Sequence, residues 1–181
     1  MGLKLILGPM KSGKSFELIS HFAHLKYTNI PYALYQSSKH VRDKGVKSRN
    51  GAILEAQLVE NISGALEKDY KIVGVEEVHM FDESAAEVVK KLLAGGTNVI
   101  ACGLDMDYKG ELFPIVRRLL ELGPKEIVYK RAVCEICKDP NAVYTQVLFK
   151  GKPVTGGLPP VLPEDGTYEY KAVCRKCFVR D

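Results

Sequence analysis

The sequence predicts an α/β fold in which a parallel sheet with flanking helices carries a glycine-rich loop, followed by a small cysteine-rich unit. Three observations support this prediction. Short apolar segments alternate with helical periodicity up to about residue 130, a glycine-rich motif separates the first such segment from the first helix, and two cysteine pairs follow residue 130. Strands that alternate with helices are typical of parallel sheets.

Composition limits the possible classes of protein. The 181 residues are enough for one main domain with a small appendage, and 46% hydrophobic and 27% charged residues are typical of a folded globular chain. No apolar run reaches the roughly 20 residues that span a bilayer, so we expect no membrane partner and a cytoplasmic location. The formal net charge of +4, with a basic cluster between Lys39 and Arg49, suits a phosphorylated ligand as well as nucleic acid.

The elements of the main unit are expected in a regular order. Strands are predicted over residues 3–7, near 58, and over 70–77, 98–104 and 125–130, and helices over 14–26, 62–66, 83–93 and 114–123. An apolar segment at 31–35 precedes a long basic loop, "QSSKHVRDKGVKSRNG", which has no clear periodicity. Cys, Gly and Pro become frequent near residues 130–133, so we divide the chain into a domain of residues 1–132 and a smaller one of 133–181.

The glycine-rich segment after the first strand fits the pattern G-x-x-x-x-G-K-[ST] of phosphate loops. Its glycines allow backbone amides to curl around a β-phosphate, and the N-terminus of the following helix adds a positive dipole. Lys14 would reach the β and γ oxygens, and the Ser15 hydroxyl would ligate Mg²⁺. The alternative is a glycine-rich turn without a ligand. The nucleotide-binding residues predicted here are Gly8, Pro9, Met10, Lys11, Ser12, Gly13, Lys14 and Ser15.

Two adjacent glutamates, Glu76 and Glu77, follow the apolar strand "YKIVGV". A phosphate loop needs a carboxylate near its magnesium ion, and the end of another core strand is the usual source. Because neighbouring strand residues point to opposite sides of a sheet, we expect different tasks for the two side chains. Glu76 would orient a magnesium-bound water, and Glu77 would act as general base on a substrate hydroxyl. The alternative is a pair of solvated glutamates.

Four cysteines form two C-x₂-C pairs, Cys134 with Cys137 and Cys174 with Cys177, separated by 36 residues. Each pair can bring two thiolates to one ion, and four thiolates complete the tetrahedral set that zinc prefers. Such a closed site leaves no open position, so a zinc ion there would be structural. We therefore expect a zinc-ribbon-like subdomain, with two disulfides or a redox dithiol as the alternatives. The fifth cysteine, Cys102, lies in an apolar strand and is expected to be a buried core thiol.

Taken together, these motifs resemble the zinc-containing thymidine kinases of the cellular and bacterial type. The resemblance is carried, in this order, by "GPMKSGKS", "EEVHMF", "GLDMDYKGELF" and "YKAVCRKCF". It implies transfer of the γ-phosphoryl group of ATP to the 5′-hydroxyl of thymidine or deoxyuridine, with Mg²⁺ and a structural Zn²⁺. It also implies a lasso loop in the zinc subdomain that closes over the nucleoside, a homotetramer, and feedback inhibition by thymidine triphosphate.

The resemblance also implies roles for individual residues. Glu77 matches the catalytic glutamate, Arg42 best matches an arginine near the transferred phosphate, and Lys14 completes the catalytic set. The nucleoside contacts that it implies are Met10, Met80, Leu104, Tyr108, Phe113 and Tyr170. Without the resemblance, Leu104, Tyr108 and Phe113 would be interpreted as core residues and Arg42 as part of a solvated loop.

Several positions depart from the family pattern, mostly around the nucleoside. Glu76 stands where the family has Asp, and His79 and Met80 stand where it has Gln and Phe. A thioether in place of an aromatic ring weakens base stacking. The lasso has only Gly166 where the family has two glycines, and Lys11 replaces an aromatic residue for no reason that the sequence reveals.

The sequence leaves two other functions open, the first of which is suggested by these departures. One is a P-loop ATP-binding protein or ATPase of the same fold that does not phosphorylate thymidine, or that acts on another nucleoside. The other is a zinc-ribbon protein that binds nucleic acid, suggested by the four cysteines and the basic loop. We consider nucleic acid the less suitable partner, because it gives Lys14 and Glu77 no role.

Overall fold

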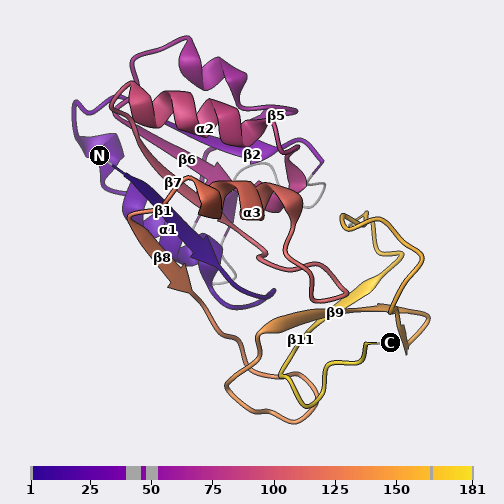
Figure 1. Ribbon diagram of the computed structural model, residues 1–181. Coiled ribbons are helices and arrows are strands. Elements are labelled where there is room, and N and C mark those ends of the chain that lie inside the picture. Colours follow the sequence, from indigo (N-terminus) through magenta and orange to yellow (C-terminus); the bar gives the residue numbers. More distant parts are fainter. Residues whose placement is uncertain (1, 40–45, 48–52, 164, 181) are drawn as a thin grey trace.

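The computed structural model describes residues 2–39, 46–47, 53–163 and 165–180. Its larger part is a six-stranded sheet in the order β5-β2-β6-β7-β1-β8, in which all neighbouring strands are parallel (Figure 1). This arrangement confirms the predicted α/β fold. The strands are β1 (Leu3–Leu7), β2 (Tyr32–Ser37), β5 (Gln57–Val59), β6 (Ile72–Glu76), β7 (Asn98–Gly103) and β8 (Glu126–Tyr129).

Helices cover both faces of this sheet, which is why its inner strands are almost wholly apolar. Helices α2 (Ala85–Ala94) and α3 (Pro114–Glu121) pack on one face, and α1 (Lys14–Phe22) packs on the other (Figure 1). Side chains of β1 alternate between the faces, so Leu5 joins the core under α2 and α3, whereas Ile6 joins the core under α1.

The described residues include three 3₁₀ turns, of which the first follows the first predicted helix, the second replaces the helix predicted over 62–66, and the third was not predicted. They are η1 (Leu25–Tyr27), η2 (Ser63–Leu66) and η3 (Val78–Met80). The first helix was predicted to reach residue 26 but ends at Phe22, and the η1 turn then keeps Leu25 buried. The apolar pattern thus continues after the α-helical hydrogen bonds stop, and periodicity alone does not separate the two conformations.

A short antiparallel pair of strands, one in the basic loop and one just after it, was not predicted from the sequence. Strand β3 (Val46–Lys47) pairs antiparallel with β4 (Ile53–Leu54). Each strand has only two residues, which is too short for a period-2 pattern to appear in the sequence.

The C-terminal part forms a three-stranded antiparallel sheet with β9 in the centre. Its strands are β9 (Tyr144–Phe149), β10 (Lys152–Pro153) and β11 (Glu169–Val173). A small core of its own includes Tyr144 and Phe178, whose rings stack with centroids 4.2 Å apart. The boundary predicted after residue 132 stays a prediction, and Ala132 pairs with Ala142 in an isolated bridge.

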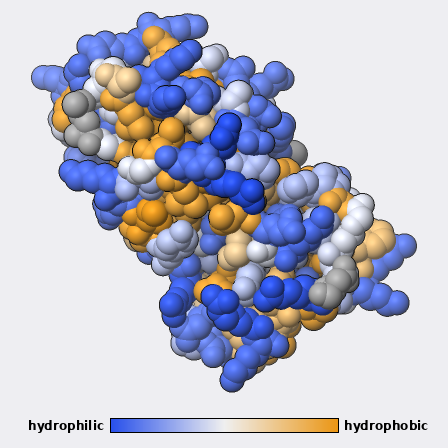
Figure 2. Space-filling view, in the orientation of Figure 1, coloured by the Kyte–Doolittle hydropathy of each residue, from blue (hydrophilic) through white to orange (hydrophobic). Residues whose placement is uncertain are grey.

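The molecular surface is mostly hydrophilic at its two ends, whereas hydrophobic residues gather in the middle of the visible face of the larger part (Figure 2). Among the described residues, no helix combines the length and the apolar character needed to cross a membrane.

The tightest packing constraint in the sheet is at Gly74 in β6. A Cβ atom there would lie 2.5 Å from Leu34 Cδ1 and 2.7 Å from Phe22 Cζ. We expect Gly74→Ala to lower the free energy of unfolding by about 1–3 kcal/mol, because both neighbours are buried and have no room to move. Urea denaturation measures this change. Gly64→Ala is the control, since no heavy atom lies within 4 Å of its added Cβ; equal stability of the two variants would contradict the expectation.

Candidate functional site

The glycine-rich loop connects β1 to α1 at the carboxyl edge of the sheet, and its glycines are required by the backbone. Gly8 has φ 144°, and a Cβ there would lie 2.4 Å from the backbone oxygen of Lys130. Gly13 has φ 82° at the position that precedes α1. Lys14 is only 7% exposed, and its Nζ donates a hydrogen bond of 2.8 Å to the carbonyl of Pro9, which lies across the loop.

One polar atom of this loop fits a phosphate ligand especially well. Ser12 is 8% exposed, and its hydroxyl has no hydrogen-bond partner among the residues that the structure describes. A buried hydroxyl without a partner is costly, and a phosphate oxygen would accept a hydrogen bond from it. The donor set of the loop therefore fits a triphosphate, although the binding of one stays a prediction.

Glu76 lies next to the serine that is predicted to ligate Mg²⁺. The Ser15 hydroxyl donates to Glu76 Oε1 at 2.5 Å, and the thiol of Cys102 donates to Oε2 of the same carboxylate. Burial, reinforced by the charge of Glu76, raises the pKa of Cys102 well above its ordinary value, so the thiol keeps its proton. Cys102 is thus buried as predicted, but it also holds Glu76, which the sequence did not indicate.

Glu77 lies just beyond the strand in which it was predicted. Strand β6 ends at Glu76, and Glu77 adopts a left-handed conformation, φ 50° and ψ 46°, at the start of η3. This conformation is unfavourable for a residue other than glycine, and such strain is typical of functional sites. The backbone turn at Glu77, and not the alternation of a strand, therefore sets the direction of its carboxylate.

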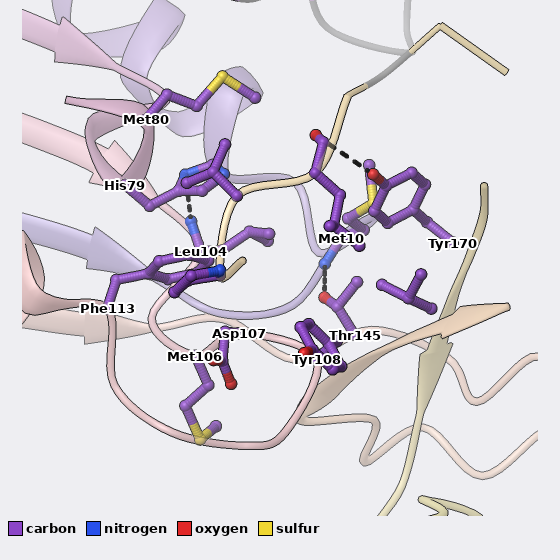
Figure 3. Close-up of a pocket in the computed structure, with 14 residues that line it drawn as sticks. Met10, His79, Met80, Leu104, Met106, Asp107, Tyr108, Phe113, Thr145 and Tyr170 are labelled. Atoms are coloured by element: carbon purple, nitrogen blue, oxygen red, sulfur yellow. Dashed lines mark hydrogen bonds between the residues drawn. The ribbon is translucent and has the colours of Figure 1, made fainter. Parts of the chain in front are cut away.

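His79 connects Glu77 to the apolar residues beside it. Its Nδ1 lies 3.4 Å from Glu77 Oε2 and accepts a hydrogen bond of 3.2 Å from the backbone N–H of Leu104. Its ring packs against Phe113 with centroids 4.9 Å apart (Figure 3). In the sequence, His79 was marked only by its position in "EEVHMF", where the family has Gln.

An open pocket lies between the six-stranded and the three-stranded sheet (Figure 3). It brings together all six residues predicted to contact a nucleoside, which are Met10, Met80, Leu104, Tyr108, Phe113 and Tyr170. Their contact with a nucleoside stays a prediction. Arg42, predicted near the transferred phosphate, lies outside the described residues. The pocket also includes His79, Met106, Asp107, Thr145, Val147, Pro160, Val161 and Leu162, which the sequence analysis did not assign to it.

The covering loop, formed by residues 154–163 and 165–168 between β10 and β11, contributes Pro160, Val161 and Leu162 to this pocket and lies where the lasso was expected. The Tyr108 hydroxyl donates to the carbonyl of Leu158 at 2.7 Å and accepts from the N–H of Leu158 at 3.1 Å. The Tyr170 hydroxyl lies 3.3 Å from the carbonyl of Pro163, to which it donates. One tyrosine from the larger part and one from the smaller part thus hold the same loop.

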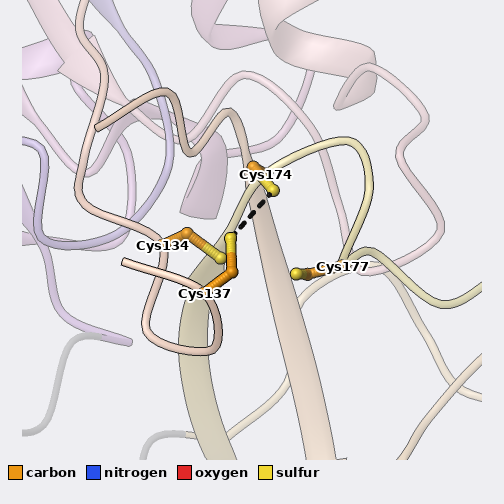
Figure 4. Close-up of side chains that lie close together, drawn as sticks. All are labelled: Cys134, Cys137, Cys174 and Cys177. Atoms are coloured by element: carbon orange, nitrogen blue, oxygen red, sulfur yellow. Dashed lines mark hydrogen bonds between the residues drawn. The ribbon is translucent and has the colours of Figure 1, made fainter. Parts of the chain in front are cut away.

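The four cysteines predicted to bind zinc point toward one another (Figure 4). Their sulfur atoms all lie within 4.8 Å of one another, and those of Cys137 and Cys174 are 3.6 Å apart. All five cysteines are free, so neither predicted pair is a disulfide. Sulfurs at about 2.3 Å from a tetrahedral zinc ion would be about 3.8 Å apart, so the cluster has the required size.

The acidities of these thiols also fit a cation. Burial acts to raise the pKa of Cys134, but the backbone N–H groups of Cys137 and Cys174 outweigh it and lower the pKa to about 6. A hydrogen bond with Cys137 raises the pKa of Cys177 to about 12. Neighbouring thiols therefore compete for protons, and a divalent cation would replace those protons.

The fold and the site together define a P-loop α/β protein with a four-thiol cluster. The family model for thymidine kinase matches residues 1–178. A thymidine kinase of Thermococcus kodakarensis is 34% identical over 184 residues, which cover 96% of this chain and 92% of that protein. The chain therefore belongs to the thymidine kinase family and is a kinase, which confirms the resemblance seen in the sequence.

A comparison of structures adds nothing to this assignment. The crystal structure of S. aureus homoserine dehydrogenase matches with a TM-score of 0.30 and 19% identity, over 71% of this chain and 32% of that chain. A likeness of this level carries no argument about fold or function.

We expect the two hydrogen bonds between Tyr108 and Leu158 to hold the covering loop closed over the pocket. Tyr108→Phe removes both and leaves the ring in place. At roughly 1 kcal/mol for each bond, the loop of residues 154–168 should open about tenfold or more often. Hydrogen–deuterium exchange measures this opening. Tyr129→Phe, at an exposed position of β8, is the control, and unchanged exchange at Leu158 in Tyr108→Phe would refute the expectation.

Metal content tests the cysteine cluster. We expect the purified protein to carry zinc, and Cys174→Ser to lose most of it, because a serine hydroxyl is a poor replacement for a thiolate ligand. Elemental analysis after dialysis measures the metal. Cys102→Ser makes the same chemical change outside the cluster and should keep the full zinc content. Equal zinc in the two variants would exclude the four-cysteine site.

Proposed function

We propose that this protein transfers the γ-phosphoryl group of ATP to the 5′-hydroxyl of thymidine. Membership of the thymidine kinase family supports this reaction. The observation that carries the proposal is the position of Met10. This residue belongs to the phosphate loop and also lines the pocket under residues 154–168, so a nucleoside in that pocket would adjoin the phosphates.

The phosphate loop and Glu76 supply the parts needed to hold ATP. The Lys14 ammonium group would bind the β and γ oxygens, and the Ser12 hydroxyl would donate to a phosphate oxygen. Ser15 and Glu76 would hold Mg²⁺, which, when bound, neutralises charge on the phosphoryl oxygens. We also propose Arg42 as a further cation near the transferred group, on the resemblance alone.

Glu77 is the proposed general base. Its carboxylate is close to His79, which lines the pocket, and its side chain is 20% exposed. Because His79 Nδ1 accepts the N–H of Leu104, that nitrogen has no proton to give to Glu77. The carboxylate can then take the proton of the 5′-hydroxyl as the oxygen attacks the γ-phosphorus and ADP leaves.

The composition of the pocket supports a pyrimidine nucleoside with a small apolar substituent. Phe113 offers an aromatic face, and Leu104 and Met106 add apolar surface. One methyl group in such a pocket is worth about 1–3 kcal/mol, so deoxyuridine would be a weaker substrate than thymidine and not an excluded one. Met80 gives less stacking than an aromatic residue would.

The resemblance extends the proposal to regulation and assembly. We propose a structural zinc ion on the four cysteines, a homotetramer, inhibition by thymidine triphosphate at the nucleoside pocket, and a cytoplasmic location. We also propose that residues 1–132 and 133–181 act as separate domains. We do not propose nucleic-acid binding, because a thymidine kinase would use both the cysteines and the phosphate loop.

Turnover with labelled ATP and thymidine tests the proposed reaction. We expect Glu77→Gln to lower kcat by about 10² to 10⁴, because an amide cannot accept the hydroxyl proton, while the KM for ATP changes little. Glu83→Gln, beside α2 and half exposed, is the matched control and should keep full activity. ATP hydrolysis that is indifferent to thymidine and deoxyuridine would instead identify an ATPase of the same fold.

A further inference from the structure

The side chain of Lys11, in the phosphate loop, forms an ion pair with the smaller part of the molecule. Its backbone is left-handed, φ 65°, and its Nζ lies 2.5 Å from Glu135 Oε2. The two side chains are 27% and 30% exposed, so solvent screens this ion pair only in part. A positive charge of the loop is thereby neutralised by the smaller part of the molecule and is not directed at a phosphate.

Glu135 is held firmly at the cysteine cluster. It lies between Cys134 and Cys137, its N–H donates to the carbonyl of Ala172 at 2.9 Å, and its Oε1 accepts the N–H of Ala172 at 2.8 Å. Ala172 lies two residues before Cys174. Glu135 therefore connects the two cysteine pairs, and the carboxylate that binds Lys11 is part of that connection.

The residue before Lys11 is attached to the same place. The Met10 N–H donates to Thr145 Oγ1 at 3.0 Å, and Thr145 is the partner of Ala172 in the pairing of β9 with β11. Two consecutive residues of the phosphate loop thus contact one cross-strand pair, Met10 through Thr145 and Lys11 through Glu135 on Ala172. A shift of the loop relative to the cysteine cluster would therefore break these contacts.

We propose that Lys11 and Glu135 are positioning residues that couple the phosphate loop to the cysteine cluster. Nucleotide bound at the loop and zinc bound at the cluster then strengthen each other's binding, because each fixes the shared contacts that the other needs. This inference rests on the proposed function for its two ligands. It also gives Lys11 a role that the sequence did not reveal.

The test measures zinc release to a chromogenic chelator, with and without a non-hydrolysable ATP analogue and Mg²⁺. In the unchanged protein we expect the analogue to slow zinc release by about fivefold or more, the lower range of typical coupling between sites. Lys11→Met and Glu135→Gln should each weaken this difference, and Lys11→Arg should keep it because guanidinium also pairs with a carboxylate. The ratio of the two rates is compared, so a general loss of stability alone does not mimic the effect.

Lys4→Met is the matched control, because Lys4 forms ion pairs with Glu17 and Glu126 that lie within the larger part. It should keep the full effect of the analogue. Binding of the analogue and thymidine turnover are measured in parallel. If thymidine is phosphorylated but the analogue leaves zinc release unchanged, or if Lys11→Met keeps the effect, the coupling is refuted and the proposed function stands. A protein that binds no analogue or no zinc would refute the coupling together with that part of the proposed function.

Discussion

The arrangement of the site depends on one constraint, the parallel pairing of β1 on both sides. β1 runs parallel to β7 and to β8, so its carboxyl end, where the phosphate loop begins, lies at the same edge of the sheet as theirs. Strand β6 runs in the same direction and ends at Glu76 on that edge. Ser15, which follows the loop, and Glu76, at the end of a distant strand, are therefore close together at this edge. Ligand sites of open parallel sheets generally lie at this edge.

The sequence predicted those parts of the protein whose chemistry is local. A phosphate loop needs its glycines and lysine at fixed spacing, and a four-thiol cluster needs two C-x₂-C pairs, so both could be recognised without a structure. The left-handed turn at Glu77 could not be predicted, because glutamate is not a residue that favours this conformation. The contact of Lys11 with Glu135 joins residues far apart in the chain, and neither has a local signature.

The pocket is a joint product of two sheets with separate cores. Leu104 and Phe113 come from the larger part, whereas Val147 and Tyr170 come from the smaller sheet. Sequence patterns identify a core within each part, but they carry no information about how two parts face each other. For this reason Thr145 and Val147, which share one side of β9, belong to the pocket without any sign of it in the sequence.

The Tyr108 hydroxyl forms hydrogen bonds with the backbone of Leu158 in the covering loop and not with the Leu158 side chain. Any residue except proline, which lacks the N–H, can make the same pair of hydrogen bonds at that position. The loop can therefore change its sequence over evolutionary time without losing its attachment. In this chain the attachment of the covering loop and the specificity of the pocket for its ligand depend on different atoms. Substitutions in the loop can therefore change the specificity while the attachment is kept.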